Sequence, residues 1–212
     1  MSTPSDRQSR KRLATRQSIS NAATRLFLER GFDQVTVDEI AAAADVGRMT
    51  VFNHFPRKED LFFDRDEEGR ELLRGALRVR DPKVAPIERF RLLAHRLVAE
   101  RSPFVEFSAR SRGFVETIQV SETLKARARA IRDELAQVVT AALSESAGRK
   151  PTDPDAHLAA DLLLATWTVA FVQAHRSFRQ SRSTKKANSV FLALVDKGSV
   201  GVKAALAGTL YA

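Results

Sequence analysis

The sequence predicts an all-α protein in which a small amino-terminal head precedes a larger helical body. Apolar residues recur at helical spacing through most of the 212 residues, and no useful length of chain shows the alternation of a strand. Hydrophobic residues make up 43% of the chain, and only 9 glycines and 7 prolines interrupt it, as in a packed globular protein. No internal repeat occurs, so an array of helical repeats is not expected.

The first expected helix begins near residue 15 and ends at Gly31, a residue suited to terminating a helix. Its apolar stripe consists of Ile19, Ala22, Ala23, Leu26 and Phe27. Residues 1–14 are predicted to be a flexible basic arm, which could lie along a nucleic acid or serve as a solubilising tail. Residues 7–30 hold seven basic side chains and one acid, so positive charge gathers at this end.

A capped helix, a short turn and a second helix are expected at residues 36–54. Thr36 followed three positions later by Glu39 forms a capping box. Asp45–Gly47 is the expected turn, where glycine allows a sharp change of direction. No acid occurs from Val46 to Lys58, so the second helix offers only basic and neutral side chains. The pattern predicts a helix-turn-helix, within a head of residues 15–60, whose second helix meets a polyanion.

Residues 61–212 are predicted to form the body. A fourth helix is expected near Pro56, since proline is tolerated in the first turn, and it should end at Asp81-Pro82. Breaks rich in proline, glycine and serine then separate further expected helices at roughly 86–101, 103–119, 121–146, 154–180 and 185–207.

Composition narrows the classes of function. The net charge of +9 and the pI of about 10.4 suit a nucleic acid, an anionic membrane surface or simply a basic soluble protein. The chain has no cysteine, and its 4 histidines show no paired ligand spacing, so no metal is expected. No glycine-flanked serine nucleophile and no glycine-rich phosphate loop is present. We therefore expect neither an enzyme nor a bound cofactor.

The most apolar segment, Leu158–Ala174, approaches the length of a membrane span. It includes Asp161 and Gln173 and lacks an aromatic belt, so we expect a buried helix of a soluble protein and no membrane partner. The basic amino-terminal segment contains no uninterrupted apolar stretch. A signal peptide is accordingly not expected, and the expected location is the cytoplasm.

A resemblance to the tetracycline-repressor (TetR) family of one-component bacterial regulators covers the segment AATRLFLERGFDQVTVDEIAAAADVGRMTVFNHFPRKEDLF. It begins near Arg16 and rests on Leu26-Phe27, Gly31-Phe32, Thr36-Val37, Ile40-Ala41, His54-Phe55 and the run from Lys58 to Leu61. The rest of the chain is similar to the family only in length and helical character. The resemblance implies a homodimer, a three-helix DNA-binding head, and a carboxy-terminal body that dimerises and binds a small effector.

The resemblance also implies the residues that would touch double-stranded operator DNA. Thr36 and Lys58 fall at phosphate contacts, and the major-groove positions are held by Arg48, Met49, Thr50, Asn53 and His54. Phe52 stands where the family commonly has tyrosine, which removes a phenolic hydrogen bond to phosphate. Gly47 replaces the usual serine cap, and Met49, where glycine is frequent, could reach a thymine methyl.

Several of these positions keep an alternative interpretation. Arg48 could read guanine or clamp a phosphate without carrying sequence information. Thr50 and Asn53 are open between base and phosphate in the same way. His54, beside Phe55 at the end of the helix, could serve as a structural hydrogen-bonding residue.

Candidates for an effector pocket are the aromatic residues of the body: Phe104, Phe107, Phe114, Trp167 and Phe171. The expected helix at 154–180 is apolar on two faces, so it needs two covers, namely the core or a pocket and a dimer partner. The alternative for Trp167 is that it simply fills the core. Gly198 and Gly201 suit a close helix seam between two subunits, or they weaken the last helix.

The sequence thus predicts a transcriptional regulator, by family default a repressor, that a hydrophobic small molecule releases from a near-palindromic operator. The alternative is a basic, helical, structural DNA-binding protein that responds to no effector.

Overall fold

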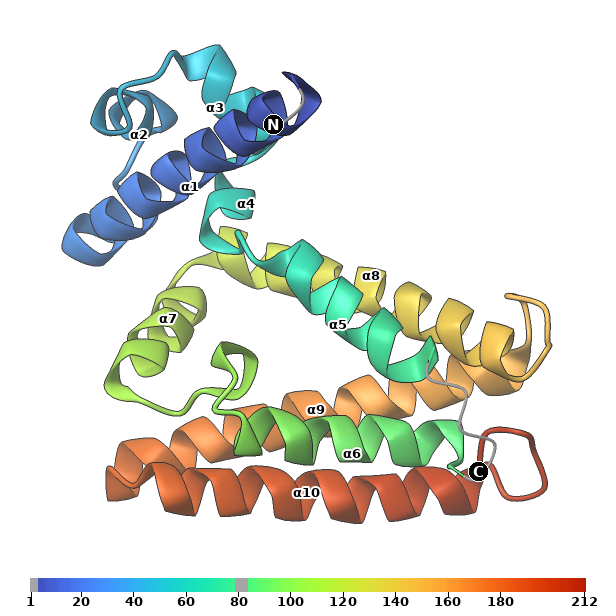
Figure 1. Ribbon diagram of the computed structural model, residues 1–212. Coiled ribbons are helices and arrows are strands. Elements are labelled where there is room, and N and C mark those ends of the chain that lie inside the picture. Colours follow the sequence, from blue (N-terminus) through green and yellow to red (C-terminus); the bar gives the residue numbers. More distant parts are fainter. Residues whose placement is uncertain (1–3, 79–83) are drawn as a thin grey trace. The chain divides into compact units, whose positions relative to one another are not determined.

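The structure is a computed structural model that describes residues 4–78 and 84–212 (Figure 1). Within these residues the chain forms helices and connections but no strand, which confirms the all-α prediction. The helices are α1 (Pro4–Arg30), α2 (Val37–Ala43), α3 (Arg48–His54), α4 (Lys58–Phe62), α5 (Asp66–Arg78), α6 (Pro86–Ala99), the short 3₁₀ helix η1 (Pro103–Val105), α7 (Ala109–Val120), α8 (Glu122–Ser146), α9 (Pro154–Ser181) and α10 (Thr184–Ala205).

The chain divides into two compact units. The head unit comprises residues up to Asp66 together with Glu116–Arg127, and the body unit comprises Glu67–Val115 with Ala128–Ala212. The end of α7 and the start of α8 therefore belong to the head unit, although they lie far from it in sequence. The domain boundaries after residues 14 and 60 stay predictions.

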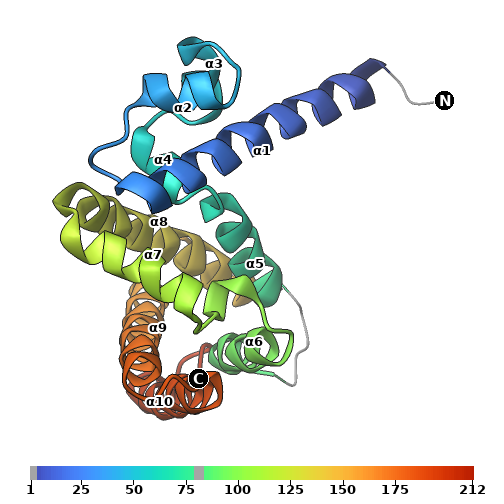
Figure 2. The same ribbon diagram turned by 90° about the vertical axis from the view of Figure 1, so that its left-hand side faces the viewer.

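The head unit is built on α1, against whose second half α2 and α4 pack (Figure 2). Its core is a small apolar cluster that includes Ile19, Ala23, Phe27, Phe32, Val35, Ile40, Ala41, Val51, Phe55, Leu61 and Leu124. Residues 4–14, expected to be a flexible arm, continue α1 as helix, and the side chains from Arg7 to Ala14 are exposed. Arginine, lysine, glutamine and alanine favour helix, which accounts for the extension.

Two expected helices are each broken. The helix expected from Pro56 is divided into α4 and α5, because the chain turns at Phe63 (φ −99°, ψ 42°). Phe62 packs its ring against Phe27 and Phe32, at centroid distances of 6.1 Å and 5.9 Å, and this anchors the end of α4 in the head core. The predicted end of α5 at Asp81-Pro82 lies outside the described residues.

The helix expected at 103–119 is also wrong in its first turn. The 3₁₀ helix η1 is followed by extended backbone at Glu106, and α7 starts only at Ala109. Phe107, in this extended segment, is fully buried, and its carbonyl accepts a hydrogen bond from Thr184 Oγ1 at 2.9 Å. Ser108 Oγ accepts from the backbone N–H of Ser111 at 3.2 Å and so marks the new helix start.

The body unit is centred on α6, α9 and α10, which lie side by side (Figures 1 and 2). The helices expected at 154–180 and 185–207 are confirmed. α9 and α10 approach closely at Gly198, where an added Cβ would lie 2.2 Å from Thr166 Cγ2. Gly201, which was considered with Gly198 for a seam between subunits, is exposed and has nothing within 4 Å of its Cβ position. Gly198 thus serves packing within one subunit.

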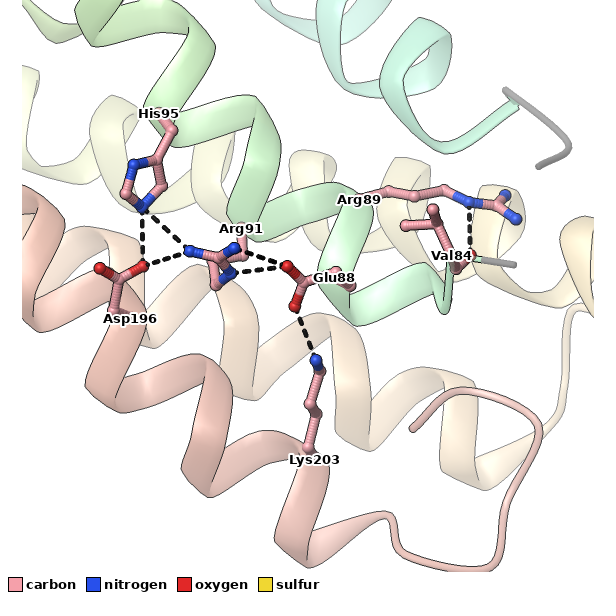
Figure 3. Close-up of polar contacts among 7 residues, drawn as sticks. All are labelled: Val84, Glu88, Arg89, Arg91, His95, Asp196 and Lys203. Carbon is pink, nitrogen blue, oxygen red and sulfur yellow. Dashed lines mark hydrogen bonds and ion pairs between the residues drawn. The ribbon is translucent and has the colours of Figure 1, made fainter. Parts of the chain in front are cut away.

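A polar network joins α6 to α10 on the body unit (Figure 3). Arg91 donates to Glu88 at 2.6 Å and to Asp196 at 2.9 Å. His95 Nε2 lies 2.7 Å from Asp196, and Lys203 Nζ lies 2.6 Å from Glu88. The hydrogen bonds from Arg91 and then Lys203 lower the pKa of Glu88 to about 2, so its carboxylate stays charged in this network.

Candidate nucleic-acid interface

The start of α2 is fixed by the predicted capping box. Thr36 Oγ1 accepts from the backbone N–H of Glu39 at 3.2 Å, and the Thr36 N–H donates to the Glu39 carboxylate at 2.7 Å. Arg30 donates to the other carboxylate oxygen at 2.7 Å. The Thr36 N–H, then Arg30 and the Thr36 hydroxyl, lower the pKa of Glu39 to about 2. Thr36, predicted to contact phosphate, is exposed and has its hydroxyl bonded to Glu39.

The turn between α2 and α3 differs from the expectation in one respect. Asp45, not Gly47, takes the left-handed conformation (φ 54°), while Gly47 is extended at φ −73° and caps α3 without a side-chain hydrogen bond. The N–H of Asp45 donates to Ala42 O and that of Val46 to Ala41 O, the pattern of a Schellman ending. Aspartate tolerates this conformation better than most residues, so the turn does not require glycine there.

Helix α3 presents one face to the core and the other outward. Val51 is fully buried, and Phe55, which caps the helix, is 1% exposed. Arg48, Met49 and Asn53 are exposed, with Met49 at 69%. The remaining predicted DNA-contacting positions on this helix, Thr50, Phe52 and His54, are partly exposed. The geometry therefore brings the predicted positions of α3 together around one accessible helix surface.

Arg48 is held by an intramolecular contact. Its Nη1 donates to Asp38 Oδ2 of α2 at 2.7 Å, and its guanidinium lies 5.5 Å from the centroid of the Phe52 ring. Both partners of the ion pair are more than half exposed, which limits the strength of the pair to about 1 kcal/mol or less. Arg48 is therefore pre-oriented by Asp38 but easily redirected. Sequence reasoning did not identify Asp38 as part of this surface.

Arg16 of α1 was counted from the sequence only as one basic residue among several, and the structure gives it a specific place. It donates to the carbonyls of His54 at 2.6 Å and Asp64 at 3.2 Å, and its guanidinium lies 4.0 Å over the Phe55 ring. A cation at the carboxy-terminal end of a helix is favourable, so Arg16 fixes the end of α3. The signal was present in the sequence, since residue 16 shares a helical face with Ile19 and Ala23.

His54 and Lys58 are both partly covered. Burial, followed by the charges of Arg12 and Arg16, lowers the pKa of His54. Lys58 Nζ lies 4.3 Å from the centroid of the Phe32 ring, and burial lowers its pKa as well. Neutral imidazole is consequently the dominant form of His54 at neutral pH, so the cationic character of this surface rests on arginine and lysine.

Comparison with known proteins identifies the head. Residues 19–64 match the family described as "Bacterial regulatory proteins, tetR family". Over 48 residues, 23% of each chain, the sequence is 48% identical to the HTH-type transcriptional repressor BepR of Brucella suis. The structure of Thermus thermophilus FadR, a TetR-family repressor in complex with lauroyl-CoA, matches 86% of this chain and 92% of its own (TM-score 0.53, 23% identity). This segment of the chain is therefore similar to TetR-family regulators.

The similarity to TetR-family proteins covers a shorter part of the chain in sequence than in fold. The first curated relatives are matched over only 23%, 35% and 50% of their own lengths. The fold likeness is longer: a SmeT–triclosan complex matches 89% of this chain and 91% of its own, at 19% identity and a TM-score of 0.56. All eight predicted DNA-contacting positions lie inside the family match at residues 19–64, and Arg16 lies just before it.

The aromatic effector candidates lie in the body unit and are largely packed on one another. Phe107 packs against Phe171 and Phe191, both at 5.7 Å between ring centroids, and Trp167 packs against Phe90 at 4.9 Å and Phe191 at 5.6 Å. Of the other two candidates, Phe104 Cε1 lies 3.5 Å from the position that a Cβ on Gly69 would take, and Phe114 is 38% exposed. Phe107, Phe171 and Trp167 thus form the centre of an aromatic cluster.

An open cavity of about 320 Å³ lies between α5 and α8, and none of the five aromatic candidates lines it. Its walls are mainly polar and charged: Arg70, Arg74, Arg78, Glu134, Gln137, Val138, Ala141, Ala142 and Glu145. Arg70 is paired with Glu134, and Arg74 with Glu67 and Glu71, so cations and anions largely neutralise one another there. The cavity is not the apolar pocket that the sequence predicted.

Proposed function

We propose that this protein is a DNA-binding transcriptional regulator, a repressor that a small hydrophobic effector releases from a near-palindromic operator. The outward face of α3 carries the proposal, because it groups Arg48, Met49 and Asn53 on a helix without a single acid. Such a surface suits phosphate and base edges in a major groove. The TetR-family match over residues 19–64 supports it. The cytoplasm is the location that this function requires.

The assignment of the DNA-contacting residues is tested by charge removal. Arg48→Ala and Lys58→Ala should each weaken binding to a duplex selected from a random library, by about 1–3 kcal/mol if a base contact is lost and less for a phosphate contact. Arg129→Ala, an exposed arginine of α8 in the body unit, provides the charge-matched control. Fluorescence anisotropy at several salt concentrations measures the affinity, and each lost phosphate contact should lower the salt slope by about 1.

The affinities of these variants for selected and random duplexes distinguish base reading from phosphate contact. Loss confined to the selected duplex means that Arg48 reads a base, whereas an equal loss on selected and random duplexes means that it clamps a phosphate. If Arg48→Ala and Lys58→Ala both bind as tightly as Arg129→Ala, this surface is not the DNA interface. Thr36, Phe52 and His54 form the second group of substitutions on the same surface.

A homodimer through the last two helices is part of the proposal. α9 and α10 bury one face in the core, yet Leu158, Val169, Val172 and Val200 remain 46%, 53%, 40% and 68% exposed. Exposed apolar side chains on long packed helices favour cover by a second copy. A dimer would place two recognition helices about 34–36 Å apart, which predicts a near-palindromic operator. By its length and composition alone, α9 is also apolar enough to cross a membrane.

Sedimentation velocity tests the dimer. Val169→Glu places a charge on the exposed face of α9 and should shift the protein to monomer. Val120→Glu, at a valine that is 81% exposed in α7, introduces the same charge elsewhere and should leave the dimer intact. A dimer that survives Val169→Glu together with Val200→Glu would exclude this face as the seam.

The effector is proposed to bind in the body unit. The solved neighbours hold triclosan and lauroyl-CoA, both with large apolar parts, and the aromatic cluster of this chain suits such molecules. A thermal-shift screen with hydrophobic compounds, followed by DNA titration, tests the sensor. Saturable stabilisation with reciprocal loss of DNA affinity supports it. No stabilisation across the screen, with DNA binding intact, favours the effector-independent DNA-binding protein.

A further inference from the structure

The buried imidazole of His175 is unusual for its surroundings. His175 lies on α9 and is 6% exposed, and neither ring nitrogen has a hydrogen-bond partner among residues 4–78 and 84–212. Its ring packs edge-on against Phe171 at 4.5 Å and Phe107 at 5.0 Å between centroids. Sequence reasoning selected the neighbouring aromatic residues but did not select the histidine.

Stability alone does not explain a histidine at this position. A buried polar group without a partner costs free energy, and a phenylalanine would fill an aromatic site without that cost. Burial lowers the pKa of His175, so the ring is neutral and offers one N–H donor and one nitrogen acceptor. Both groups lie among aromatic rings, where a bound molecule could satisfy them.

Phe107 covers this imidazole from a segment that is not helical. It follows η1, after Glu106 in extended backbone, while its ring partners Phe171 and Phe191 lie on helices α9 and α10. The hydrogen bond from Thr184 Oγ1 to the Phe107 carbonyl ties the segment to the start of α10. A ring carried by a loop can leave its site at lower cost than a ring carried by a packed helix.

We propose that the Phe107 ring occupies the site of an uncharged aromatic effector, whose hydroxyl or carbonyl group hydrogen-bonds to His175 when the effector displaces Phe107. The site has an aromatic wall from Phe171 and Phe191 and a polar group at its base. Trp167 Nε1, also buried and without a hydrogen-bond partner in the described part of the chain, is a second donor beyond Phe191. The inference rests on the proposed sensor function and names the chemistry of its ligand.

The first experiment removes the Phe107 ring from the proposed site. In the Phe107→Ala protein, p-cresol should bind about three- to tenfold more tightly than toluene, because its hydroxyl can pair with His175. In Phe107→Ala/His175→Phe, toluene should become the tighter ligand, since the cresol hydroxyl is then buried without a partner. Isothermal titration calorimetry measures both affinities. The wild-type protein should bind p-cresol about tenfold more weakly or worse, because its own ring competes.

The same two probes, p-cresol and toluene, are used for the control and for the outcomes that would overturn the proposal. His157→Phe, at an exposed histidine of the same helix, should leave the preference for p-cresol unchanged. Equal binding of the two probes to Phe107→Ala, or a preference that survives His175→Phe, overturns the proposal. If Phe107→Ala does not fold, the histidine labelling experiment on the wild-type protein decides the proposal.

A second experiment reads the imidazole directly in the full-length wild-type protein. Because the chain has only 4 histidines, ¹⁵N-histidine labelling gives few ring signals, and His175→Phe assigns the one of interest. Saturating p-cresol should shift the His175 ring nitrogens and leave those of His157 in place. An unmoved His175 signal at saturation refutes the site. If His175 responds but selected DNA still binds equally well, the site stands and the sensor function fails.

Discussion

The proposed DNA interface of the head unit lies on an outer surface, whereas the proposed effector site of the body unit lies inside the core. In the head unit, Val51 and Phe55 hold α3 in place, and the side chains that would meet DNA point away from them. In the body unit, Phe107 and Phe171 both pack the core, while Phe107 also occupies the proposed effector site and Phe171 lines it. Packing and function therefore use different residues in the head unit and the same residues in the body unit. Substitutions should separate the two properties in the first case and couple them in the second.

The strongest test of the head unit concerns Arg16, which fixes α3 from within. Arg16→Ala should reduce the free energy of unfolding by about 2–4 kcal/mol, because two charge-assisted hydrogen bonds and a cation–π contact are lost. Urea denaturation measures the loss. Arg25→Ala, an exposed arginine of the same helix, should change stability by less than about 0.5 kcal/mol. Equal effects of the two substitutions would mean that Arg16 does not hold the end of α3.

The same contrast decides how much the sequence could predict. The helix-turn-helix follows from contacts only a few residues apart, such as the capping box of Thr36 and Glu39, so its elements are readable locally. Asp38 and Arg16 were missed, because their roles depend on partners 10 and 38 residues away. The helices α9 and α10 of the body unit are readable from periodicity, whereas the breaks at Phe63 and Glu106 are not. The sequence does not tell which aromatic residues line a site, because a core and an apolar pocket require the same residue types.

A second test probes the tightest helix contact of the body unit. Gly198→Ala should destabilise the protein by about 1–3 kcal/mol, because the new methyl group would overlap Thr166 on α9. Gly201→Ala, three residues along the same helix, has open space at its Cβ position and should stabilise it by about 0.5–1 kcal/mol. Thermal unfolding of the two variants supplies the measurement. Destabilisation by Gly201→Ala alone would instead place the close contact at Gly201, in the seam between subunits.

A third test compares carboxylates whose pKa values are about 2 in both units, Glu39 and Glu88. Since folding lowers these pKa values from 4.5, each group contributes stability above pH 4.5 that is lost as the pH falls towards 2. Thermal unfolding between pH 5 and pH 2.5 should show a smaller pH dependence for Glu88→Gln and for Glu39→Gln. Glu88 should contribute about 1 kcal/mol to the free energy of unfolding. This contribution should shrink at high salt, because the charged side chains of Arg91 and Lys203 provide it.

Glu39 should respond to salt less than Glu88, since the largest cause of its low pKa is a backbone N–H and not a charge. Identical salt dependence in Glu39→Gln and Glu88→Gln would contradict this difference. The head unit would then rely on ion pairs as much as the body unit does.

The smallest expected effect concerns Asp38, the acid that holds Arg48. Asp38→Asn should raise DNA affinity about two- to fivefold, because it removes the competing partner of Arg48 and a negative charge near phosphate. Asp45→Asn removes an equal charge from the neighbouring turn, where asparagine also tolerates the left-handed backbone, and is the matched control.

Anisotropy titrations with selected and random duplexes then separate three possible roles of Asp38. Equal gains in both variants mean a general charge effect. A gain specific to Asp38→Asn on both duplexes means that Asp38 only competes for Arg48. A larger gain on the random duplex means that Asp38 orients Arg48 for base reading, so the outer surface of the head unit would owe its selectivity to an ion pair between α2 and α3.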